Sequence, residues 1–205
     1  MSGQSGTIEA TEPDEISDRV RELLEISAQL FAERGFDATS MRDISAAAGV
    51  SKALLYHHFA SKDDIYARIA FSSTQHLYGF VEERIPADGT SAEKIRAFMI
   101  ATASFFSQHR AAWIAASNAF WVDRNRQRVG NRMVRRRQFE QRLRGMISEG
   151  IEAGEFRDID PADAGRLILS SINWMHRWFD PAKEHTAEEF AARYADLILN
   201  GMKQS

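Results

Sequence analysis

The side chains best suited to chemistry lie between residues 39 and 62, where hydroxyl groups, cations and ring nitrogens recur at short intervals. Such donors suit an anionic phosphate backbone when they stand at the start of a helix. The residues we expect to contact phosphate are Thr39, Arg42, Tyr56, His57 and Lys62. Lys52, Ala53 and Leu54 would instead meet base edges, where lysine donates to guanine and small apolar groups touch a thymine methyl.

Two helices joined by a tight turn would position these side chains. Ser40 and Asp43 have the spacing of a capping box, which predicts a helix from about Met41. Gly49 should end that helix in the left-handed conformation, and Ser51 should cap the next one. The pattern predicts a helix-turn-helix, whose second helix enters the major groove of DNA, with both capping serines on the same DNA-binding surface. The alternative is an ordinary helical hairpin.

Three short motifs in this stretch match a known family of proteins. They are Gly49-Val50-Ser51-Lys52, Leu55-Tyr56-His57-His58-Phe59 and Ser61-Lys62, preceded by Phe31-Ala32-Glu33-Arg34-Gly35-Phe36 and Thr39. Over about residues 18–66 the chain resembles the tetracycline-repressor (TetR) family of bacterial transcriptional regulators. Family members usually carry glycine and threonine where this chain has Ala53 and Leu54, so the resemblance does not transfer an operator sequence. It implies nine helices, three of them in the DNA-binding part.

Composition excludes several other classes of protein. The chain has 205 residues and a net charge of −3. Of its residues 44% are apolar, which is enough to form a hydrophobic core. It has no cysteine and six dispersed or adjacent histidines, so we expect no metal and no cofactor. The absence of a secretory signal and of a long apolar run predicts a cytoplasmic protein without membrane contact. No catalytic constellation is apparent, so we expect no catalytic residues and no enzyme.

Charge and periodicity divide the chain into three parts. Residues 1–17 hold acids but no lysine or arginine and are rich in glycine, serine and threonine, so we expect a mobile acidic arm. Residues 18–64 would form the DNA-binding domain, and residues 65–205 a helical effector-binding and dimerisation domain. Apolar residues recur at helical spacing and never with period two, so the predicted fold class is all-α with about nine helices.

Capping and turn residues predict where the later helices begin and end. Ser61 should open a helix that runs to about Glu83, and Ser91 should open another. A shorter helix is expected over 111–122, and an arginine-rich one that ends at the glycines of 150–154. A proline opens the helix expected over 161–179. A capping box formed by Thr186 and Glu189 should start the last helix.

The last two predicted helices carry apolar stripes that a monomer would leave partly bare. One interpretation is that they only pack on their own domain. The interpretation we favour is a four-helix interface between two copies related by a two-fold axis, which the resemblance also implies. The residues expected in this homodimer interface are Leu167, Ile168, Phe190, Tyr194, Leu197 and Ile198.

Aromatic rings and arginines gather in the C-terminal part of the chain. At helical spacing the rings are often only core, but four tryptophans also suit the lining of a ligand cavity. Nine arginines lie between Arg124 and Arg144, against Asp123 and Glu140, and form either a solvated face or an anion site. The candidate effector-binding residues are Phe98, Phe105, Trp113, Phe120, Trp121, Arg136, Trp174, Arg177 and Trp178.

These patterns, together with the resemblance to the TetR family, predict a homodimeric repressor that binds a palindromic double-stranded DNA operator. A small hydrophobic effector with an anionic head, such as an acyl-CoA, would release it, since several TetR-family regulators respond to such thioesters. The helix after the DNA reader would transmit the change, because its displacement alters the spacing of the two recognition helices. The alternative is a DNA-binding regulator or architectural dimer without a small-molecule effector, controlled by a protein partner.

Overall fold

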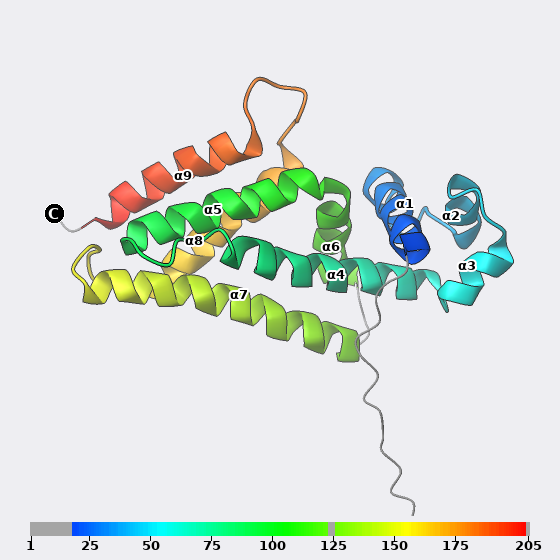
Figure 1. Cartoon of the computed structure of the whole chain (residues 1–205), viewed down its shortest axis with the longest axis horizontal. Coiled ribbons are helices and arrows are strands. Elements are labelled where there is room, and N and C mark those ends of the chain that lie inside the picture. The colour runs from blue at the N-terminus through cyan, green and yellow to red at the C-terminus, as the bar shows by residue number, and fades with distance from the viewer. Residues whose placement is uncertain (1–17, 123–125, 204–205) are drawn as a thin grey trace, which may run out of the picture.

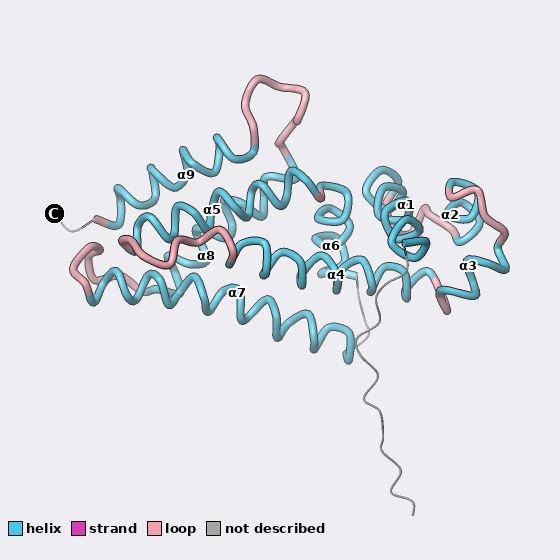
Figure 2. The backbone as a smooth tube through the Cα atoms, viewed as in Figure 1, coloured by secondary structure: helices cyan, strands magenta, loops and turns pink. Residues whose placement is uncertain are grey.

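The computed structural model describes residues 18–122 and 126–203, and the side chains of 118–135 lie outside the description, as does the predicted arm. Within these ranges the chain forms nine α-helices, one 3-10 helix and no strand, which confirms the all-α prediction (Figure 2). None of these helices is both long and apolar enough to cross a membrane. The elements are α1 (Asp18–Arg34), α2 (Met41–Ala47), α3 (Lys52–His58), α4 (Lys62–Glu82), α5 (Ser91–Gln108), α6 (Arg110–Val122), α7 (Arg126–Glu152), α8 (Pro161–Asn173), η1 (Trp174–Arg177) and α9 (Ala187–Met202).

Local capping accounts for the starts of most helices. In α2, α3, α4 and α9 a side-chain oxygen accepts the amide of the third helical residue, as the sequence predicts. The capping residues are Ser40, Ser51, Ser61 and Thr186. Helix α5 does start at Ser91, but the residue that caps it is Thr90, which forms a capping box with Glu93.

Helix α8 is shorter than the sequence predicts. The expected helix ran to Phe179, whereas α8 ends at Asn173 and the chain tightens into η1. The amide of Phe179 then donates to the carbonyl of Met175 at 2.8 Å. Met175 and Phe179 continue the buried side of Ile172 at a spacing of three and four residues, while Trp174 and Trp178 lie on the exposed side.

The molecule is elongated, with α1, α2 and α3 at one end and α5, α7, α8 and α9 toward the other, while α4 runs between them (Figure 1). It has two hydrophobic cores. The smaller core surrounds Phe31 and Phe59 at the first end, and the larger core surrounds Phe98 at the second. Helix α6 enters both cores, because Ala115 is buried in the smaller one and Trp113 in the larger.

Candidate DNA-binding and effector sites

The turn between α2 and α3 is built as the sequence predicts. Gly49 has a φ of 63°, a left-handed conformation that glycine adopts without steric cost. The amide of Val50 donates to the carbonyl of Ser45 at 3.0 Å. The Ser51 hydroxyl then accepts the amide of Leu54 at 3.1 Å, which begins α3. The hydrogen bonds of this turn join residues only a few positions apart in the sequence. Together they hold α3 in a defined orientation against α2.

Asp43 closes the capping box at the start of α2. Its carboxylate accepts hydrogen bonds from the hydroxyl and the amide of Ser40, and these bonds lower its pKa below the usual value. The negative charge also suits the positive end of the helix dipole. Arg42 is exposed beside this cap, where a cation can reach an external phosphate.

Helix α3 has one buried and one open side. Leu55 and the following Phe59 are fully buried in the smaller core, so the helix is fastened along its inner face. The predicted base-reading and phosphate-binding side chains of this helix all lie on its exposed surface. They are Lys52, Ala53, Leu54, Tyr56 and His57. This arrangement leaves a short, rigidly supported helix with a polar and aromatic outer face, as a groove-binding helix requires.

Thr39 is placed differently from our expectation. Its side chain is 1% exposed, and its hydroxyl donates to the carbonyl of Gly35 at 2.8 Å. It therefore holds the turn between α1 and α2 together and does not present its hydroxyl to a phosphate. Sequence spacing missed this, because a threonine just before a helix has the same pattern whether it faces inward or outward.

Lys62 has an internal role that the sequence did not reveal. Its ammonium group donates to the carbonyl of Phe36 at 2.6 Å and lies 4.1 Å from the centroid of the Phe36 ring. The start of α4 is thus joined to the turn before α2. The two residues are 26 positions apart, so no local pattern could have indicated the contact.

The predicted effector-binding residues do not form one group in the structure. Phe98, Phe105 and Trp113 are buried in the larger core. Trp174 is 62% exposed, and Arg177 lies over its ring at 5.5 Å on the outer surface, so neither faces that core. At about 100° per residue, Trp174 and Arg177 fall on the side of the helix that faces away from Ile172 and its buried neighbours. Arg136 is exposed on α7, and the side chains of Phe120 and Trp121 lie outside the description.

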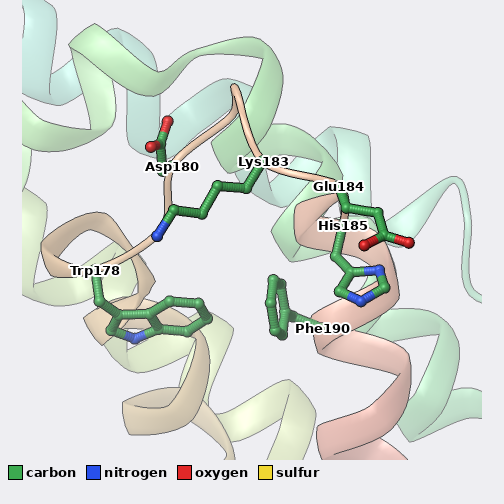
Figure 3. A pocket seen from close by; sticks show the side chains of 6 residues that line it. All are labelled: Trp178, Asp180, Lys183, Glu184, His185 and Phe190. Carbon is green, nitrogen blue, oxygen red and sulfur yellow. The ribbon is translucent and has the colours of Figure 1, made fainter.

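Trp178 lines a groove of about 450 Å³ beside the loop that follows η1 (Figure 3). Its ring meets Phe190 edge-on at a centroid distance of 5.0 Å. The remaining lining residues are polar or charged, namely Asp180, Lys183, Glu184 and His185. The groove is therefore open and mixed in charge, with aromatic walls on one side.

Two buried nitrogens near the start of α6 have no hydrogen-bond acceptor. They are the indole Nε1 of Trp113 and the guanidinium Nε of Arg110. Trp113 is 7% exposed and packs on Phe106 at 5.7 Å between ring centroids. Buried donors normally have a partner, so this pair of nitrogens marks a place where an acceptor is missing. Within the described residues, no group of three or more metal-ligating side chains is present.

The predicted dimer residues divide into three groups by their exposure. Leu167 and Leu197 are 58% and 73% exposed, which leaves large apolar side chains open to a partner. Ile168 is fully buried in the larger core, so assigning it to an interface was wrong. Adjacent residues on a helix point about 100° apart, and the structure turns Leu167 outward and its neighbour inward. Phe190, Tyr194 and Ile198 are half-buried against the larger core.

Helix α6 also makes a direct bond to the long helix α4. The Tyr66 hydroxyl donates to the carbonyl of Ala115 at 2.8 Å, and both groups are buried. Ala111 and Ala112 pack on the smaller core beside this bond. The small side chains let α6 pack closely beside this bond, near the end of α4 next to α3.

A capped helix-turn-helix with an open recognition helix, set on a larger helical bundle, defines the class of helix-turn-helix DNA-binding proteins. The family of bacterial regulatory proteins of the tetR type matches residues 23–69, and a tetracyclin repressor-like C-terminal domain matches residues 88–202. The chain belongs to the TetR family of transcriptional regulators.

Individual relatives agree over nearly the whole chain. The HTH-type transcriptional repressor KstR2 of Rhodococcus jostii is 31% identical, covering 91% of this chain and 92% of the relative. The crystal structure of the regulator PfmR from Thermus thermophilus is 36% identical, with a TM-score of 0.83 over 92% of this chain and 99% of that one. A third match is AibR in complex with isovaleryl coenzyme A and operator DNA, 25% identical with a TM-score of 0.80 over 88% and 97% of the two chains.

Proposed function

We propose that this chain is a dimeric repressor that binds a palindromic operator and leaves it when a small molecule occupies the C-terminal bundle. The main observation in support of DNA binding is the outer face of α3. Lys52 and Tyr56 are exposed there, while Leu55 anchors the inner face of the helix in the smaller core. Phosphate contacts would come from Arg42, Tyr56 and His57, and base contacts from Lys52, Ala53 and Leu54.

A palindromic operator has two half-sites, so two copies of the chain would be needed to occupy it. A dimer through α8 and α9 would cover the exposed Leu167 and Leu197, and Trp174 stands on η1 directly after α8. It would also present two recognition helices to half-sites about 34 Å apart, one turn of DNA.

The position of α6 between the two cores supports the proposed control by a small molecule. Helix α6 lies in both, and its Ala115 carbonyl is bonded to Tyr66 on α4. An effector that binds better when α6 is displaced would shift the protein toward a form in which the two α3 helices no longer match the operator. The similarity to a protein solved with isovaleryl coenzyme A and operator DNA supports an acyl-CoA as the first class to test.

The direct test is an electrophoretic shift on DNA upstream of the protein's own gene. The purified protein should retard that fragment and not a scrambled one, and isovaleryl-CoA or a longer acyl-CoA should raise the apparent Kd about 5- to 150-fold, the usual range of allosteric coupling. Retardation of both fragments with equal affinity would contradict a specific operator. Specific binding that no acyl-CoA weakens would leave the DNA-binding role and reject this class of effector.

A further inference from the structure

We propose that Arg110 and Trp113 on α6 form a binding site for an oxyanion of the effector, a carboxylate or a phosphate. This inference rests on the proposed function, because it names the polar end of the same effector site. It starts from the two buried donors that lack an acceptor. An aromatic core around Phe105 and Phe106 would receive the apolar part of such a ligand.

The indole of Trp113 is the more informative of the two donors. It is more than nine-tenths buried, so water has little access to its N–H group. Folded proteins leave very few buried donors without a partner, because each one forfeits the hydrogen bond it makes in the unfolded chain. A phenylalanine would fill the same core without this cost. The unsatisfied N–H group therefore indicates an acceptor that arrives with a ligand.

Arg110 adds a positive charge on the same side of the helix. Residues three apart on a helix are neighbours, with about 5–6 Å between their Cβ atoms. Other arginines of the bundle have carboxylate partners: Arg142 is bonded to Glu82, and Arg144, whose Nε also lacks an acceptor, is bonded to Glu140 through Nη2. In the described part of the chain, no carboxylate forms an ion pair with Arg110, although its Nε is buried. The first turn of α6 carries the positive end of the helix dipole as well.

The place of this pair explains how an anion would act on DNA binding. Ala111 and Ala112, between the two donors, pack on the smaller core, and Trp113 packs in the larger one. An oxyanion bound by Arg110 and Trp113 would thus favour a shifted position of α6, the helix that contacts both cores. The ligand would act at the start of α6, and the Tyr66–Ala115 bond would pass the displacement to α4.

The test is a binding titration of the full-length protein with three probes: isovaleryl-CoA, free coenzyme A and isovalerate. The wild type should bind at least one of them, and the set separates the sources of the oxyanion, because coenzyme A carries only phosphates and isovalerate only a carboxylate. Trp113→Phe and Arg110→Gln should each weaken the probe that binds at least tenfold. Tyr78→Phe, which removes a hydroxyl from an exposed ring on α4 and keeps the ring, is the control and should bind like the wild type.

Thermal unfolding without a probe distinguishes a binding role from a packing role. Trp113→Phe keeps an aromatic ring but is smaller, so the lost packing and the removal of the unsatisfied N–H act in opposite directions and its melting temperature should stay close to that of the wild type. The inference is overturned if both variants bind as tightly as the wild type, or if no probe binds the wild type. Operator binding without any probe is measured in parallel. A wild-type protein that does not bind the operator would instead refute the proposed function.

Discussion

We propose that single residues on α3 contribute either to positioning the protein on DNA or to recognising the DNA sequence. We expect Tyr56→Ala to weaken binding to every DNA sequence by a similar factor, because a phosphate contact carries no base information. Lys52→Ala should change which operator bases matter, since we propose that this side chain faces the base edges. A competition shift assay with operators altered at single base pairs measures both effects.

The choice of residues in that assay follows from the structure. Tyr56 is 53% exposed and has no internal hydrogen bond in the described residues, so its removal leaves the fold in place. Lys62 is less suitable, because its ammonium is already bonded to the carbonyl of Phe36 and its loss would also loosen the turn before α2. If Lys52→Ala lowered affinity without altering base preference, the assignment of α3 to the base edges would be wrong.

His109, at the end of α5, should make stability depend on pH. Burial against Phe105 lowers the pKa of His109, the nearby His76 lowers it further, and Glu25 opposes the change. As pH falls below about 6.5, the unfolded chain takes up the proton first, so the folded protein loses stability. His109→Gln should therefore show a smaller drop in melting temperature between pH 7 and pH 5 (about the range in which histidine titrates).

The control for that experiment is His57→Gln, which changes an exposed histidine on α3. It should keep the acid sensitivity of the wild type. Identical pH profiles for His109→Gln and the wild type would show that this ring does not contribute.

At the scale of elements, the bond between α4 and α6 is the clearest test of coupling. Tyr66→Phe removes the hydroxyl that donates to Ala115 and should lower the free energy of unfolding by about 0.5–1.5 kcal/mol, because one buried hydrogen bond is lost while the Ala115 carbonyl keeps its bond within α6. The factor by which the effector weakens operator binding should fall toward one. Tyr78→Phe is the matched control on α4, because Tyr78 is half-exposed and its ring packs on Phe139.

Both quantities come from the same set of measurements. Denaturant unfolding gives the stability, and operator titrations with and without effector give the coupling factor. An unchanged coupling factor in Tyr66→Phe would place the transmission elsewhere, for example in the packing of Ala111 and Ala112 on the smaller core.

The capping boxes of α2 and α9 allow a second comparison between elements. Ser40→Ala and Thr186→Ala each remove a cap with the same geometry and should each cost about 1 kcal/mol of stability. Only the first should also weaken operator binding, because α2 supports α3. Equal losses of affinity in both variants would mean that the effect comes from general stability.

At the scale of the whole molecule, assembly and DNA binding should fail together. Leu197→Asp places a charge on the most exposed large apolar side chain among the described residues and should split the dimer. Operator binding would then be lost at ordinary concentrations, because one copy reaches only one half-site. Sedimentation and a shift assay measure the two properties. Gln29→Asp, on the surface of α1, is the control, and a dimeric Leu197→Asp protein that still binds DNA would contradict an interface through α9.

The sequence by itself determined the features that depend on neighbouring residues. Ser40, Gly49 and Ser51 specify the turn between α2 and α3 through bonds that span at most a few positions, and the structure reproduces them. Helix periodicity likewise predicted an all-helical chain. These properties follow from backbone geometry and side-chain capping, which act over a single turn.

Tertiary structure decided which side of each helix faces inward. A periodic stripe places Leu167 and Ile168 on one helix but does not say which of them meets the core, and the same holds for the burial of Thr39. The contacts of Lys62 with Phe36 and of Tyr66 with Ala115 join residues far apart in the chain, so no local pattern encodes them. The physical reason is that burial and partner choice depend on how all the helices pack at once, whereas a helix end depends only on its own turn.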